Sequence, residues 1–221
     1  MAPRTKPRIS PRKAPQQARS AQLVADVLEA ATHVLTRDGA PRFTTARVAE
    51  RAGVSVGSVY QYFPNKEAIL FRLQVDEWTR TSALLHDILA DRTCPPQQRL
   101  RTLLDTFLRT EREEAALRTA LDDAAPLYRD APEARQMEAR GQRLFTTFLG
   151  ELMPKAAPRE RAVMADIVTT IMGAVGDTVT SDHSDADVAR KAAILGDMLC
   201  GYFAGRAAAP GARSARTRSR F

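Results

Sequence analysis

Cysteine and histidine are scarce in this chain, which has two cysteines and three histidines among its 221 residues. Cys94 and Cys200 stand far apart, and neither belongs to a pattern of metal-ligand spacing. Two isolated thiols form no disulfide framework, and such spacing offers no zinc site. We therefore expect no metal ion and no cofactor, and a protein that works in a reducing cytoplasm.

Long hydrophobic runs are also missing. No apolar stretch approaches the roughly 18 residues that span a bilayer, and even residues 192–205 are interrupted by Asp197. The N-terminus is basic, but no apolar stretch follows it before Asp26, in contrast to a signal peptide. The sequence therefore predicts no membrane partner.

Enzyme motifs are absent as well. The histidines are dispersed, and the chain has no nucleophile elbow, no phosphate-binding glycine loop and no paired-carboxylate motif. Acidic residues gather over residues 111–123 without histidine or cysteine at ligand spacing, so we interpret them as a solvated charged face. These residues are Glu111, Glu113, Glu114, Asp122 and Asp123. We expect that the protein is not an enzyme.

Acidic residues are missing from both ends of the chain. The overall charge is +7, but the 11 basic residues in segments 1–19 and 206–221 leave 22 basic and 26 acidic residues between them. Both ends have few large apolar side chains, so we predict a basic disordered arm (1–19) and a basic disordered tail (206–221). The N-terminal arm is either solvated or, next to a DNA-binding helix, a source of phosphate or minor-groove contacts. A solvated tail is the favoured interpretation for residues 206–221.

The segment between residues 44 and 63 has the pattern of a helix, a tight turn and a second helix. Thr44 suits an N-cap, Gly53 suits the end of the first helix, and Ser55 suits the cap of the second. Val59 and Phe63 are spaced to pack inward. Residues expected to face outward are small, apolar or hydrogen-bonding, as a surface that contacts base edges and phosphates requires. These residues are Val56, Gly57, Ser58, Gln61 and Tyr62.

This segment resembles the TetR family of bacterial transcriptional regulators. The matching positions are Thr44, Val48-Ala49, Ala52-Gly53-Val54-Ser55, Gly57-Ser58-Val59-Tyr60, Tyr62-Phe63, Lys66-Glu67 and Leu70, with residues 27–31 and 35–39 resembling the family's first helix. The resemblance covers roughly residues 20–80. It implies an all-α fold of about nine helices, with a three-helix DNA-binding domain (20–66, motif 44–63) and a helical ligand-binding and dimerisation domain (67–205).

The resemblance also implies a homodimer that binds a palindromic operator in double-stranded DNA. Candidates for phosphate contacts are Thr44, Ser55 at the start of the second helix, Tyr62 and Lys66, and Tyr60 is either a further phosphate contact or a packed aromatic residue. Candidates for base edges are Thr45, Arg47, Val56, Gly57, Ser58 and Gln61. The long helix that starts at Lys66 is the expected transmitter between the two domains.

Aromatic and leucine side chains of the second domain suit either a filled core or an apolar cavity between helices. They are Trp78, Leu104, Phe107, Phe145 and Phe148. The resemblance favours a cavity, because most proteins of that family bind an inducer there. It implies a small-molecule effector that is apolar or amphipathic.

The last two predicted helices are apolar on more than one face. Residues 159–181 repeat apolar side chains at four-residue spacing, and residues 185–204 carry two neighbouring apolar faces. A helix of this kind is buried in its own core or shared with a second subunit. The resemblance makes these helices the dimer interface, with Ile167, Ile171, Val175, Leu195, Met198, Leu199 and Tyr202 as candidates.

The leading hypothesis is a repressor that a ligand releases from its operator. The alternative is a helix-turn-helix protein of the same fold without a small-molecule ligand, controlled by a protein partner or organising DNA. A filled helical core would favour the alternative, and a cavity would favour the repressor.

Overall fold

The computed structural model describes residues 18–127, 132–179 and 182–208. Within these ranges the chain forms nine α-helices and two short 3-10 helices and contains no strand, as the sequence predicts. Most of the predicted basic arm and tail lie outside the described residues. The helices are α1 (Ala18–Asp38), α2 (Thr45–Arg51), α3 (Val56–Tyr60), α4 (Lys66–Ala90), α5 (Pro96–Glu113), α6 (Ala115–Ala124), α7 (Pro132–Leu152), α8 (Pro158–Gly176) and α9 (Asp185–Ala208), with η1 at Ala40–Arg42 and η2 at Ala125–Leu127.

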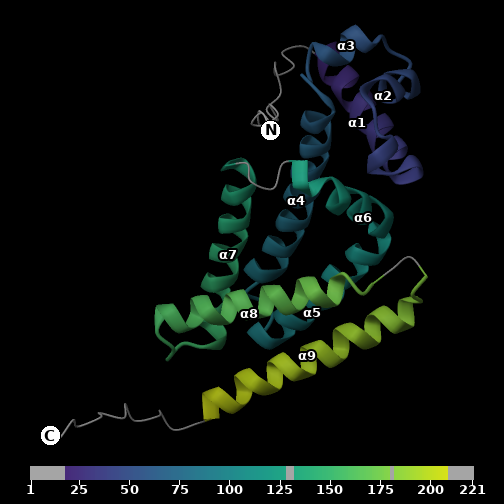
Figure 1. Ribbon diagram of the computed structural model, residues 1–221. Coiled ribbons are helices and arrows are strands. Elements are labelled where there is room, and N and C mark those ends of the chain that lie inside the picture. Colours follow the sequence, from purple (N-terminus) through teal and green to yellow (C-terminus); the bar gives the residue numbers. More distant parts are fainter. Residues whose placement is uncertain (1–17, 128–131, 180–181, 209–221) are drawn as a thin grey trace, which may run out of the picture.

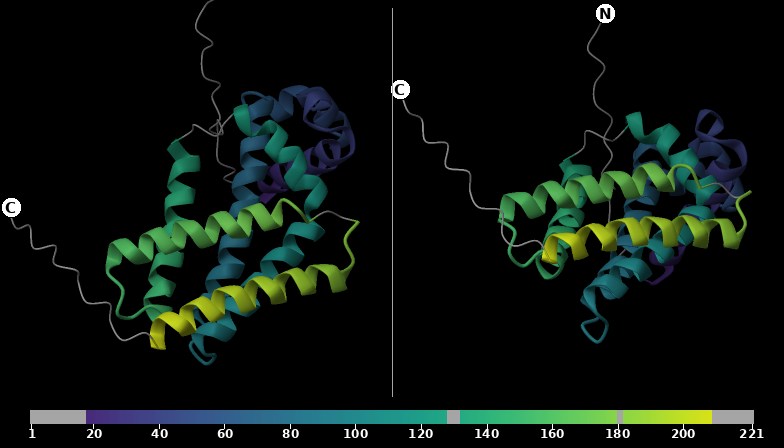
Figure 2. Two further views of the ribbon diagram at one scale, coloured as in Figure 1. Left: turned by 60° about the horizontal axis from the view of Figure 1, so that its bottom comes forward. Right: turned by 90° about the horizontal axis from the view of Figure 1, so that it is seen from below.

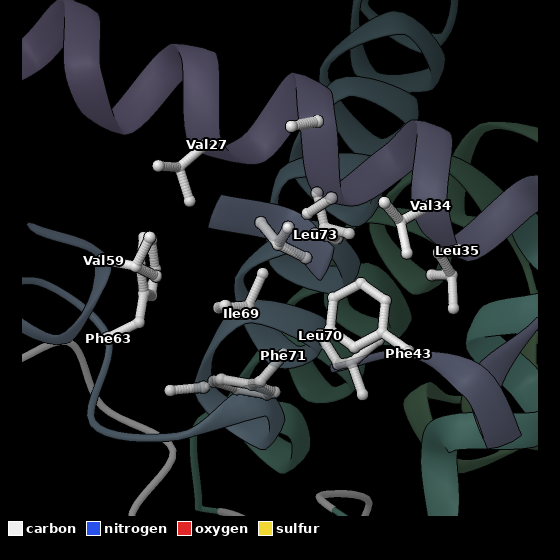
Figure 3. Packing of buried hydrophobic residues seen from close by; sticks show 14 of the residues in the cluster. Val27, Val34, Leu35, Phe43, Val59, Phe63, Ile69, Leu70, Phe71 and Leu73 are labelled. Carbon is white, nitrogen blue, oxygen red and sulfur yellow. The ribbon is translucent and has the colours of Figure 1, made fainter. Parts of the chain in front are cut away.

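The first three helices form a compact unit at one end of the molecule (Figure 1). Its core is built from buried side chains of α1, such as Val27 and Leu35, together with Phe43, Val59 and Phe63. Figure 3 shows these side chains converging with Ile69, Leu70 and Leu73 from the start of α4. Since Val59 and Phe63 are 0% and 1% exposed, the inward packing predicted for them is confirmed.

Helix α6 belongs to the same core, although it starts 49 residues after the start of α4. Its residues Ala120, Leu121 and Ala124 are buried in the cluster that contains Val27, Leu35 and Phe43. The α6 helix therefore packs on α1 and η1 as well as on α4 and α5. The cluster lies on both sides of the predicted domain boundary at residues 66 and 67, so packing does not divide the chain there.

A second core lies among α4, α5, α7, α8 and α9. Leu100, Leu103 and Leu104 of α5 are fully buried in it, at the i, i+3, i+4 spacing of an amphipathic helix. Helices α8 and α9 run alongside each other across α5 in both views of Figure 2, and α9 packs mainly on α5. Helix α4 extends from the first core into the second and joins them (Figure 1).

Candidate nucleic-acid interface

The ends of α2 and α3 are fixed by the side chains that the sequence indicates. The hydroxyl of Thr44 accepts a hydrogen bond from the backbone N–H of Arg47 at 3.3 Å, and the hydroxyl of Ser55 accepts one from that of Ser58 at 3.0 Å. Each bond satisfies a backbone donor that has no partner inside its helix. Both predicted N-caps are confirmed.

The turn between α2 and α3 is closed at Gly53. Its φ of 68° lies in the left-handed region that glycine adopts without strain. The next residue, Val54, donates its backbone N–H to the carbonyl of Ala49 at 3.0 Å, while Gly53 donates to Glu50 at 3.1 Å. These two bonds form a Schellman motif, which ends α2 and sets the direction in which α3 leaves the turn.

Helix α3 presents a row of solvent-facing positions. Val56 is 39% exposed and Tyr60 is 42% exposed, so both side chains reach solvent. Gly57 and Gln61 are also exposed, and Ser58 is half-buried with its hydroxyl 2.8 Å from that of Ser55. Because Val59 anchors the opposite side of α3, these positions are displayed from a rigid support.

Two residues predicted to contact DNA, Tyr62 and Thr45, are buried. Tyr62 is only 8% exposed and joins the first core, so the prediction that its side chain faces outward is wrong. Helix α3 ends at Tyr60, and the chain then turns, so the helical period no longer decides where Tyr62 points. Thr45 is 7% exposed at the first position of α2, which corrects its place among the side chains offered to base edges.

The charged candidates lie at the edges of this surface. Arg47 is exposed on α2, and its guanidinium forms an ion pair of 2.9 Å with Asp38 at the end of α1. Lys66 is half-buried at the first residue of α4, directly after the N-cap Asn65, whose side chain accepts from the N–H of Ala68 at 2.8 Å. The start of α4 is therefore fixed to the same unit as α3.

The five predicted pocket residues are divided between the two cores. Leu104, Phe145 and Phe148 are buried in the second core, and Phe107 packs against it. The Phe145 and Phe148 rings meet edge to face at 6.0 Å. Trp78 instead packs against the first core. Four of the five side chains thus fill space between α4, α5 and α7 to α9.

A small polar cavity of about 80 Å³ lies between α4, α5 and α6. Trp78 is the one predicted pocket residue in its lining. The remaining lining residues are mostly charged or polar: Gln74, Glu77, Glu111, Arg118, Leu121 and Asp122. Arg118 forms ion pairs with Glu77 at 2.7 Å and with Glu111 at 3.0 Å across this cavity.

The buried acids of this cavity were not recognised from the sequence. Glu111 is 9% exposed, so its assignment to a solvated face is wrong. A signal is nevertheless present: Leu100, Leu104, Leu108 and Glu111 follow one helical stripe, and Glu77 continues the stripe of Leu70 and Leu73. A charged residue in a buried stripe requires a partner, here Arg118.

The candidate dimer residues fall into two groups. Leu195 and Leu199 are buried in the protomer's own core, which corrects their assignment to an exposed interface. Ile167, Met198 and Tyr202 are 44%, 66% and 42% exposed, while Ile171 and Val175 are half-buried. Val163 and Ile194, each 54% exposed, extend the outward apolar face of α8 and α9.

Two protein-family models match this chain, one at the DNA-binding unit and one over the helices that follow. The model of bacterial regulatory proteins of the tetR family matches residues 27–73, which include α2 and α3. The model of the tetracyclin repressor-like C-terminal domain matches residues 95–205, half of the chain. The protein belongs to the TetR family. It is therefore a helix-turn-helix transcriptional regulator of the kind that binds DNA.

Individual TetR-family relatives are distant in sequence. The transcriptional regulator BetI of Cronobacter sakazakii is 30% identical, covering 70% of this chain and 75% of BetI. The transcriptional repressor KstR of Rhodococcus jostii is 22% identical, covering 79% of this chain and 81% of KstR. The solved structure of the fatty acid degradation regulator FadR from Bacillus halodurans has a TM-score of 0.63 and 16% identity, covering 86% of this chain and 97% of FadR. That structure shares the fold.

The part of the chain that the structure describes holds no helix long and apolar enough to cross a bilayer.

Proposed function

We propose that this TetR-family protein is a repressor that binds a palindromic operator in double-stranded DNA as a homodimer in the cytoplasm, and that a small ligand releases it. The observation that supports the proposal most directly is the exposed row on α3. Val56, Gly57 and Gln61 face solvent, while Val59 and Phe63 hold the segment against a fully buried core.

The side chains of that row have distinct tasks in the proposed complex. The isopropyl group of Val56 contacts a thymine methyl, Gln61 pairs with adenine, and Gly57 permits close approach of the backbone. Thr44, Ser55 and Lys66 contact phosphates at the edges of the groove, with Ser58 and Arg47 beside them. Tyr60, which is 42% exposed, fits a phosphate contact better than a packed aromatic residue.

A dimer follows from two considerations. One helix-turn-helix unit buries too little DNA surface for selective binding, and a two-fold dimer doubles the contacts on a palindrome. The outward apolar face of α8 and α9 supplies the surface for it. Ile167, Met198 and Tyr202 are its central side chains, with Ile171 and Val175 at its inner edge.

The proposed ligand is amphipathic and enters at the cavity between α4, α5 and α6. Trp78 and Leu121 offer apolar contacts there, and the Arg118 network offers polar ones. A volume of about 80 Å³ is well below the roughly 300 Å³ of a typical ligand site, so binding must displace α6 or its side chains. Because α6 also packs on α1, such a displacement reaches the DNA-binding unit.

Selection of bound fragments from sheared genomic DNA at near-physiological salt tests the proposal. We expect one short palindrome to be recovered, with half-sites about one helical turn or a multiple apart. The Gln61→Ala variant should then relax selectivity at one base pair per half-site, whereas the matched variant Glu113→Ala, exposed on α5, should leave selectivity unchanged. Fragments without a shared sequence would instead favour a protein that organises DNA.

A further inference from the structure

We propose that the ion pair of Glu111 with Arg118 makes operator binding depend on pH, because protonation of Glu111 strengthens binding. The cluster of Glu77, Glu111 and Arg118 is called the joint below. This inference rests on the proposed function as an effector-released repressor. It assigns to a buried ion-pair cluster, rather than to the DNA-contacting surface, a role in setting the affinity for DNA.

The joint connects three helices through one arginine. The guanidinium of Arg118, on α6, lies 2.7 Å from Oε1 of Glu77 on α4 and 3.0 Å from Oε1 of Glu111 on α5. Glu77 is 1% exposed and Glu111 is 9% exposed, so water screens these two ion pairs only weakly. One positive charge therefore serves two buried carboxylates, and the carboxylate of Glu114 lies 3.9 Å from the same guanidinium.

The charged groups around Glu111 are mostly acidic. Helix α4 contributes Glu77, which also accepts from Nε2 of Gln74 at 3.2 Å and from the hydroxyl of Thr81 at 2.9 Å. The remaining charged neighbours of Glu111 are Arg118 and Asp122 on α6 and Asp177 at the end of α8. Arg80 and Glu114, which pair at 2.6 Å, act on Glu77 instead. Arg80, the other arginine of this region, is therefore already paired with Glu114.

This environment favours the neutral form of Glu111. Burial raises the pKa of Glu111 to about 7, an effect that Arg118 opposes and that Glu77, Asp177 and Asp122 reinforce. Burial also raises the pKa of Glu77, again against the attraction of Arg118. Glu111 accordingly exchanges its proton in the physiological range, which an ordinary glutamate does not.

Close packing leaves Glu111 little room to move within the cluster. A Cβ added at Gly176 of α8 would lie 3.1 Å from Cγ of Glu111 and 3.2 Å from the ring of Phe107. Helix α8 thus closes the side of α5 at which Glu111 emerges. Water can therefore reach an ionised Glu111 only if a helix moves. Helix α6 is the shortest of the helices around the cavity, and we expect it to be the one that moves.

A shift of α6 couples the proton to DNA binding. Opening the cavity hydrates Glu111 and returns its pKa toward the ordinary value, so the closed arrangement binds the proton more tightly than the opened one. The closed cavity, at about 80 Å³, is too small for an effector-sized molecule and thus corresponds to the effector-free, operator-binding form. Operator affinity should therefore fall as pH rises through 7.

Operator binding by the full-length protein tests the inference across pH 6.0–8.0 at constant ionic strength. For the wild type we expect affinity to fall at least threefold over this range, with a limit of about tenfold per protomer for one titrating group. Glu111→Gln mimics the neutral carboxyl and should lose this part of the dependence. Glu113→Gln removes an exposed carboxylate two residues away and should behave as the wild type.

A second variant separates titration from a packing effect. Glu77→Gln removes a buried carboxylate that competes with Glu111 for Arg118 and repels its charge, so the midpoint of the pH dependence should move to lower pH. Equal pH dependence in the wild type and Glu111→Gln, with operator binding intact, would overturn the joint alone. Absence of operator binding at every pH would overturn the proposed function and this inference with it.

Discussion

The guanidinium of Arg47 lies 2.9 Å from the carboxylate of Asp38, on the outer side of the helix-turn-helix unit. The pair joins the end of α1 to α2, and both side chains reach solvent, with 49% of Arg47 and 26% of Asp38 exposed. In the proposed complex, the positive charge of Arg47 is therefore partly neutralised by Asp38 when Arg47 contacts DNA.

Replacing Asp38 with Asn should strengthen DNA binding. The change frees Arg47 and removes a negative charge near the phosphates, and an exposed pair of this kind is worth about 0.2–1 kcal/mol, so affinity should rise by roughly up to fivefold. Fluorescence anisotropy with an operator duplex measures the change. Weaker binding would show that Asp38 orients Arg47 for a base contact.

Lys66→Ala should weaken binding to all duplexes by a similar factor. Loss of one phosphate contact reduces the slope of log K against log salt by about 0.9, and this slope is the quantity to compare between variant and wild type. Asn65 still caps α4 in the variant, so the fold is preserved. A loss restricted to the operator sequence would move Lys66 to the base-reading group.

Met198→Glu should disrupt the dimer. Met198 is 66% exposed in the protomer, so the charge costs little in the isolated chain but is buried without a partner in the proposed interface. Light scattering coupled to gel filtration should show a monomer. The control is Leu84→Glu, an exposed leucine of α4, which should remain dimeric. An unchanged dimer for Met198→Glu would place the interface elsewhere.

The stability of the folded chain should depend on the ionisation of Glu111. Because its pKa is raised from 4.5 to about 7 on folding, the folded state binds more protons than the unfolded state between these values. Stability from this group is fully present below pH 4.5, falls as pH rises to 7 and then levels off. The loss is on the order of 3 kcal/mol. Glu111→Gln should remove it in denaturant titrations across this range, and a wild-type-like profile would contradict the assignment.

Local features of the DNA-binding unit are predictable from the sequence because short-range hydrogen bonds determine them. Thr44 and Ser55 cap helices within three residues of themselves, and Gly53 supplies a backbone conformation that other residues avoid. Tyr62 shows where this reasoning stops. Its direction depends on the end of α3 two residues earlier, because beyond that end the helical period no longer places the side chains.

The second domain is less predictable because its side chains are positioned by distant helices. The stripe of leucines in residues 100–108 indicates which side of α5 is buried and that Glu111 lies on that side, but not that Arg118 of α6 is its partner. Leu195 and Met198 are both apolar and three residues apart, yet one is buried and the other 66% exposed. Only the packing of α9 on α5 distinguishes them.

The packing of α6 against α1 bears on attempts to recombine this protein with other regulators. A chimaera that joined residues 1–66 to a foreign sensor domain would lack Ala120, Leu121 and Ala124, which belong to the core of the DNA-binding unit and pack on α1 and η1. Leu121 alone is 1% exposed, and the loss of such a leucine costs about 2–5 kcal/mol. The exchangeable DNA-reading module of this chain is thus discontinuous, and a designer must transplant α6 together with α1 to α4.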